Sequence, residues 1–319
     1  MLRFISRRLV GMVFVLFVVS ILVFMIFNVI PNSPPAQRLA GKNATPQLVH
    51  SIEEEWGFDE SLPKQYVTMM KKVFTNELIS YSPRISVEDR IVEGIPATLS
   101  LSIGAGILWL SFGLLLGYLS AIRAGGALDK FLTGFAIAGI SIPVFLIAPV
   151  LLYFLTYKLE IFPNSGYVKL TEDPAGWFTH LILPWFTLAI LSIGFYSRVL
   201  RSNMLDVMNE DYVRTARAKG LSERKVMTRH VLRNSLIPIV TLFGLDFGAT
   251  VAGTAIITEY IFGIEGVGLY AAESIRKLEL PPIMGVTLYG AFFVVFFNAL
   301  VDVAYAYLDP RVRLGSSAQ

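Results

Sequence analysis

The chain opens with an uninterrupted apolar run that is long enough to cross a lipid bilayer. Residues 9–30 carry no charged side chain, and as a helix rising about 1.5 Å per residue they cover the ~30 Å hydrocarbon core. Five further apolar runs follow, at residues 97–121, 131–157, 180–200, 236–261 and 283–308. Because lipid leaves unpaired backbone groups unsatisfied, these lengths predict an all-α integral membrane protein with six transmembrane helices.

Composition supports a membrane protein. The sequence is 54% hydrophobic and only 16% charged, whereas soluble domains carry about a quarter charged residues. The first run exceeds the roughly 7–15 apolar residues of a signal peptide, and Pro31-Asn32-Ser33-Pro34-Pro35 follows it in place of a cleavage site, so we expect it to be retained. The chain contains no cysteine, which excludes disulfides, thiolate metal sites and cysteine nucleophiles.

The distribution of basic residues predicts the orientation in the membrane. Residues 198–233 hold nine Lys/Arg and four Asp/Glu, whereas residues 31–96 hold seven and nine. Lysine and arginine are enriched in cytoplasmic segments, so both termini of the multi-pass chain are expected in the cytoplasm. The other basic residues on the predicted inner side are Arg3, Arg7, Arg8, Arg123, Lys130, Arg311 and Arg313.

The spans divide the chain into four parts. Residues 1–30 form the cytoplasmic N-terminus and first span, 31–96 an extracytoplasmic cap, 97–308 a five-helix core that includes a cytoplasmic loop at 201–235, and 309–319 a cytoplasmic tail. Within the cap, Thr45-Pro46 predicts a helix start and Gly57 its stop. A second cap helix is expected to pack on the outer ends of the bundle rather than to bind a ligand, through Tyr66, Met69, Met70, Val73 and Phe74.

Three carboxylates within or near the spans are candidate residues of a translocation pathway. Asp246 lies midway along the fifth span, where it either meets cationic groups of a substrate or is protonated or bonded to a neighbouring helix. Asp302 lies close to the inner end of the sixth span, where a structural role is favoured. Glu259 is expected to reach the outer interface. Prolines 143, 149 and 184 predict bent helices, which suit a moving pathway and also occur in static bundles.

Signatures of catalysis are missing from the sequence. It contains no HExxH, GxSxG or GxxxxGK[ST] pattern, and its three histidines are far apart. We therefore predict no catalytic residue and no metal site, and we expect any nucleotide chemistry to belong to another polypeptide.

The basic loop between the fourth and fifth spans predicts a compact projection. A helix is expected from Met204 to Ala218, a turn at Gly220, and a second helix that Ser222 caps and that ends near residue 232. The small side chains Ala216 and Ala218 suit close seating in a groove of a partner. Binding of the lysines and arginines to anionic lipid headgroups is the alternative interpretation.

The same loop resembles the EAA loop of ABC importer permeases, whose pattern is E-A-A, three residues, G, then nine residues and I-x-L-P. Arg214-Thr215-Ala216, three residues and Gly220 follow it, and Arg214 in place of Glu is typical of the peptide-importer branch, as is the stretch His230–Arg233. GIPATLSLS at 94–102, FPNSGY at 162–167 and VDVAYAYLDPRVR at 301–313 also agree with that branch. The resemblance covers nearly the whole chain.

This resemblance implies a type I ABC importer permease fold, a place in the cytoplasmic membrane of a bacterial or archaeal cell, and several partner proteins. A second, similar permease would complete the pathway, one or two cytoplasmic ATPase subunits would bind ATP and Mg, and an external binding protein would deliver the substrate. The chain itself would hold no cofactor and bind no nucleic acid. The residues of the ATPase-coupling loop would be Glu210, Arg214, Ala216, Lys219, Gly220 and Leu221.

The expected cargo is a di- or oligopeptide. The same architecture also serves sister branches that carry nickel chelates, opines or oligosaccharides, because the loop motif reports the ATPase partner and not the cargo. A membrane anchor that holds a cytoplasmic protein without moving solute is the alternative from another functional class.

Overall fold

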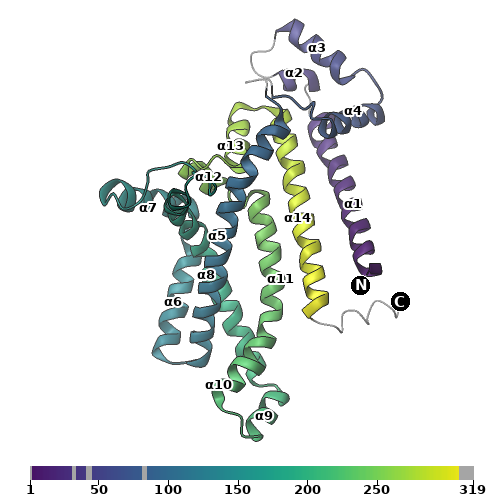
Figure 1. Cartoon of the computed structure of the whole chain (residues 1–319). Coiled ribbons are helices and arrows are strands. Elements are labelled where there is room, and N and C mark those ends of the chain that lie inside the picture. The colour runs from purple at the N-terminus through teal and green to yellow at the C-terminus, as the bar shows by residue number, and fades with distance from the viewer. Residues whose placement is uncertain (1, 31–33, 41–44, 81–84, 309–319) are drawn as a thin grey trace. The chain divides into compact units, whose positions relative to one another are not determined.

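The computed structural model describes residues 2–30, 34–40, 45–80 and 85–308, and the described residues are mainly helical (Figure 1). Five helices are long and apolar enough to cross a membrane, and a strongly bent helix pair is a sixth candidate. The predicted all-α membrane fold is confirmed, with six spans if the bent pair counts as one. The chain forms two compact units, residues 1–99 with 249–296 and residues 100–248 with 297–319.

The first unit begins with a long helix and a small group of cap helices. Helix α1 (Leu2–Phe24) continues through a π-helical segment (Met25–Val29). The cap contains α2 (Pro35–Ala40), α3 (Pro46–Trp56) and α4 (Leu62–Phe74). As predicted, the Thr45 side chain accepts a hydrogen bond from the Leu48 N–H at 3.3 Å, and Gly57 ends α3 in the left-handed conformation.

The cap packs on α1 through an aromatic contact. Tyr66 of α4 lies edge-on to Phe17 and Phe24 of α1, and its hydroxyl is 2.7 Å from the Ser20 hydroxyl. The predicted packing of this face is therefore seen at Tyr66 and at the buried Met69. Phe74 departs from the prediction, because it is the last residue of α4 and its side chain remains 81% exposed.

The remainder of the first unit holds two short helices between longer ones. Helix α5 (Val87–Ile122) begins ten residues before the predicted span, and Glu88 and Asp89 in its first turn suit the helix dipole. The predicted fifth span, residues 236–261, is interrupted within a π-helical segment (Thr250–Thr254) whose helical geometry breaks at Gly253. Two short helices follow, α12 (Ile256–Phe262) and α13 (Val267–Lys277), and then the long helix α14 (Leu280–Leu308).

The second unit contains the bent helix pair. Helix α6 (Ala127–Ser141) and the helical stretch of α7 (Val144–Leu151) with its π-helical extension (Leu152–Lys158) meet at 98°. The bend lies at Ile142-Pro143, because a residue before proline is pushed towards extended backbone, and Ile142 has φ −95° and ψ 117°. The predicted third span is thus interrupted at Pro143.

Helix α8 (Pro174–Met208) follows and is about 52 Å long at 1.5 Å per residue. It continues eight residues past Leu200, where its apolar stretch ends. Two boundaries differ from the prediction. The prediction of a single helix from Met204 to Ala218 is wrong, because the chain turns at Asn209-Glu210 before α9 (Asp211–Ala218). The second helix also does not end near residue 232: α10 (Glu223–Lys225), a π-helical segment (Val226–Leu232) and α11 (Arg233–Ala249) are continuous.

Candidate coupling loop and intramembrane carboxylates

The loop after α8 folds into a compact projection made of α9, a glycine turn and α10. Gly220 adopts φ +77°, the left-handed region that favours glycine. Ser222 stands at the N-cap of α10, as predicted, but its side chain makes no cap hydrogen bond. Figure 1 shows α9 and α10 beyond the end of α8 within the second unit. We call residues 209–232 the coupling loop.

Apolar side chains hold the coupling loop together from inside. Five of them are buried: Val213, Ala216, Val226, Met227 and Val231. Ala216 is only 5% exposed, so its small side chain serves the contact between α9 and the following π-helical segment. The other predicted coupling residues Glu210, Arg214, Lys219 and Gly220 are exposed, and Leu221 is half-buried.

An ion pair that the sequence analysis missed closes the loop across Gly220. The Arg217 guanidinium donates to both carboxylate oxygens of Glu223, at 2.7 and 3.1 Å. The hydrogen-bonded Glu223 carboxylate raises the pKa of Arg217. Because the two residues are six apart and a turn separates their helices, no helical spacing rule predicts their contact.

Polar contacts hold the loop and its two flanking helices together. Asn234 at the start of α11 donates to the Tyr212 hydroxyl of α9 at 2.7 Å, and it also donates to the His230 carbonyl. Asn203 of α8 donates to the Ser235 carbonyl of α11 at 3.5 Å. The loop is thereby tied to the helix that leaves it, and that helix is tied to the one that enters the loop.

Asp246 makes a specific contact within the second unit. Its carboxylate accepts a hydrogen bond of 2.8 Å from the hydroxyl of Tyr196 on α8. Tyr196 is fully buried, whereas Asp246 is half-buried. Of the two alternatives predicted for Asp246, a bond to a neighbouring helix is therefore present, and the remaining exposure leaves room for a second role.

Glu259 lies in the first unit, on α12, and is completely buried. Its carboxylate accepts hydrogen bonds from the Thr98 hydroxyl at 2.7 Å and from the Leu269 N–H at 2.9 Å, and Thr98 in turn accepts one from the Val267 N–H. A Cβ on Gly266 would lie 2.3 Å from the Glu259 carboxylate, so glycine is required there by space. The carboxylate therefore holds the start of α13 against α5 and does not reach an exposed interface as predicted.

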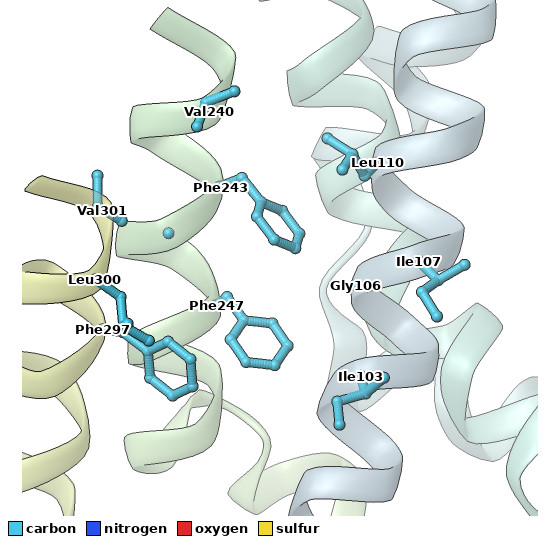
Figure 2. A pocket seen from close by; sticks show the side chains of 11 residues that line it. Ile103, Gly106, Ile107, Leu110, Val240, Phe243, Phe247, Phe297, Leu300 and Val301 are labelled. Atoms are coloured by element: carbon cyan, nitrogen blue, oxygen red, sulfur yellow. The ribbon is translucent and has the colours of Figure 1, made fainter. Parts of the chain in front are cut away.

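The remaining candidate carboxylate and an apolar cavity add no further polar contact. Asp302 lies on α14, and its side chain is outside those that the structure describes. A cavity of about 380 Å³ opens in the second unit between α5, α11 and α14 (Figure 2). All of its lining residues are apolar or glycine, and Phe243, Phe247 and Phe297 form one wall. Among the described residues, no group of three or more His, Cys, Asp or Glu could hold a metal ion.

Comparison with known proteins decides the family. The model described as "Binding-protein-dependent transport system inner membrane component" matches residues 113–314, and the model of the N-terminal part of such components matches residues 1–102. The chain belongs to this family. The resemblance to ABC importer permeases is therefore confirmed, and this permease is a multi-pass membrane protein.

Relatives of this permease match over almost their whole length. A "Probable peptide ABC transporter permease protein" of Sinorhizobium fredii is 37% identical over 97% of this chain and 99% of its own. A "Dipeptide transport system permease protein" of Bacillus subtilis is 34% identical over 98% and 99%. Among solved structures, an inward-facing MetNI methionine ABC transporter aligns with a TM-score of 0.54 and 14% identity over 69% of this chain and 96% of its own, which shows a shared fold.

Proposed function

We propose that this permease forms half of the translocation pathway of an ATP-driven importer of di- or oligopeptides. The observation that carries the proposal is the match to permeases named for peptide transport, at 34–37% identity over nearly the full length. A second, homologous permease would supply the other half of the pathway. An extracytoplasmic binding protein would deliver the peptide.

The coupling loop is the part of this chain that would transmit the energy of ATP hydrolysis. It is a preformed structure, since a buried apolar core and the Arg217–Glu223 pair fix the angle between α9 and α10. Its exposed residues Arg214, Lys219 and Gly220 would contact a groove of a cytoplasmic ATPase subunit. ATP and Mg would be bound by that subunit, and this chain would do no chemistry on them.

The carboxylates divide into two roles in this proposal. Asp246 would contribute to the pathway, because it is half-buried and lies midway along the predicted fifth span. Glu259 would keep the connection between α12 and α13 in place, because its carboxylate is enclosed and hydrogen-bonded. Asp302 would more readily have a structural role, because it lies close to the inner end of the predicted sixth span.

Mass spectrometry of the proteins that copurify with the tagged chain in mild detergent tests the proposal. We expect an ATPase, a homologous permease and a binding protein, with peptides retained on the binding protein. A retained nickel chelate, opine or oligosaccharide would keep the importer and replace the cargo. The absence of an ATPase at every detergent strength would contradict the proposal and favour a membrane anchor.

A further inference from the structure

An ion pair between a buried aspartate and a half-buried arginine joins α6 to α8 within the second unit. Asp129 lies in the first turn of α6, and its side chain is only 5% exposed. The Arg201 guanidinium of α8 donates to both of its oxygens, from Nε at 2.7 Å and from Nη2 at 2.8 Å. This two-pronged geometry fixes the orientation of both side chains, which a single lysine contact would not do.

The same carboxylate also holds α5 and the turn between α5 and α6. The Ser120 hydroxyl of α5 donates to it, as does the Gly125 N–H at 2.8 Å. The Thr133 hydroxyl, one turn further along α6, lies 3.4 Å away. Three helices therefore meet at one buried charge whose hydrogen-bonding capacity is largely used, which is the condition under which a buried ion pair is stable.

Close backbone packing places the three helices directly against one another beside this ion pair. A Cβ on Gly117 of α5 would lie 2.6 Å from the Ser197 carbonyl oxygen of α8. A Cβ on Gly194 of α8 would lie 2.5 Å from the Ala136 carbonyl oxygen of α6. Smooth glycine contacts keep the helices close, whereas the directional bonds of the ion pair hold α8 at one position along α5 and α6.

The position of Arg201 connects this block to the coupling loop. Helix α8 runs without a break from Arg201 to Met208, and α9 begins three residues later at Asp211. A displacement of α9 therefore reaches α8 first. Going back along α8 from the loop, the first ion pair that joins α8 to another helix is that of Arg201 with the buried Asp129.

We propose that Asp129 and Arg201 are positioning residues that form the joint through which movement of the coupling loop is passed from α8 to the α5–α6 pair. This inference rests on the proposed function. With the joint intact, α5, α6 and α8 move as one body when the ATPases close. Without it, α8 moves alone and the energy of ATP hydrolysis is not delivered to the pathway.

The test compares coupling in purified importer complexes reconstituted in liposomes. Arg201→Met leaves Asp129 buried without its partner. The Asp129→Asn/Arg201→Met double variant is therefore tested as well, since replacing both charges is better tolerated than removing one. In both variants we expect the ratio of cargo-stimulated to basal ATPase activity to fall at least about fivefold, which is the lower end of typical coupling between two sites. Arg201→Lys should lower this ratio by a smaller factor. Arg198→Met removes an exposed arginine of the same helix and should leave the ratio unchanged.

A distance measurement separates a joint from a general loss of stability. Since the chain has no native cysteine, spin labels can be placed at Lys130→Cys on α6 and Asp206→Cys on α8, in complexes with cysteine-free partner subunits. We expect the distance between the labels to stay constant through the ATP cycle in the otherwise unchanged chain. In the double variant it should change with nucleotide.

Only a joint predicts both effects together. A constant label distance in the double variant, or an unchanged stimulation ratio in either Met variant, would overturn the proposal. Stimulation that is absent from the unmodified complex would contradict the importer function and the joint with it. Normal stimulation in the unmodified complex and in both Met variants would contradict the joint alone.

Discussion

At the scale of single residues, this permease uses its buried charges in different ways. Asp129 and Glu259 are enclosed, and each is hydrogen-bonded by groups from more than one helix. Asp246 is half-buried and accepts a hydrogen bond from Tyr196. Burial without a partner would be costly for a carboxylate, so the two enclosed residues have structural roles, whereas the half-buried Asp246 is the carboxylate proposed to meet a passing molecule.

Replacement of Asp246 by asparagine should change cargo preference. The amide can still accept the hydrogen bond from Tyr196, so the helix contact is retained while the charge is lost. We expect uptake of cationic peptides, relative to neutral ones, to fall about fivefold, equivalent to ~1 kcal/mol of lost attraction. Uptake by reconstituted liposomes of matched peptides that differ only in charge measures the effect.

Tyr196→Phe is the matched control for this prediction, because it removes the hydrogen bond and keeps the carboxylate. It should leave the preference for cationic peptides in place. An unchanged ratio of cationic to neutral peptide uptake in Asp246→Asn, or the same change in both variants, would show that the charge of Asp246 does not set the preference.

At the scale of elements, the turn between α9 and α10 depends on one backbone conformation. Gly220 has φ +77°, and a Cβ there would meet nothing within 4 Å, so the cost of a substitution is entirely in the backbone. Valine at this position should distort the turn at a cost of roughly 1–3 kcal/mol. We expect Gly220→Val to lower cargo-stimulated ATPase activity about tenfold, equivalent to ~1.4 kcal/mol, while membrane insertion is retained.

The control for this substitution is a second left-handed glycine. Gly57 has φ +63° at the end of α3, and a Cβ there would be in ordinary contact distance of Glu60. Gly57→Val introduces similar backbone strain at a position distant in sequence from the coupling loop. It should leave cargo-stimulated ATPase activity unchanged. Normal stimulation in Gly220→Val would remove the coupling role of the turn.

The sequence predicts the long elements well and their ends and contacts less well. Apolar length locates the spans, and Thr45, Gly57 and Gly220 mark local starts and turns because capping and left-handed backbone depend on neighbouring residues. The break at residues 209–210 and the continuous helix from Glu223 were missed, because tertiary contacts such as Tyr212–Asn234 decide them. The Asp129–Arg201 contact joins residues 72 positions apart, which no local pattern reports.

At the scale of the whole molecule, the arrangement in the membrane follows from charge and apolar length. Five candidate spans overlap the predicted ones, the third predicted span is a bent helix pair, and the orientation is a prediction from the positive-inside rule. The cap helices α2–α4 are expected outside the cell membrane. The turn between α5 and α6, the coupling loop and both termini are expected in the cytoplasm.

Single cysteines in the native cysteine-free chain test this orientation. In intact spheroplasts, a membrane-impermeant maleimide should label Glu54→Cys in α3 and fail to label Arg123→Cys in the turn after α5, although both positions are exposed in the structure. Permeabilised membranes should allow both to react. Labelling of Arg123→Cys from outside would reverse the predicted topology.

The length of α8 has a consequence for what the coupling loop can meet. The eight residues from Arg201 to Met208 extend about 12 Å past the apolar stretch, whereas the headgroup layer on one side of a bilayer is roughly 6 Å deep. We therefore expect α8 to act as a stalk that holds α9 and α10 beyond the lipid phosphates, where a soluble protein could reach them.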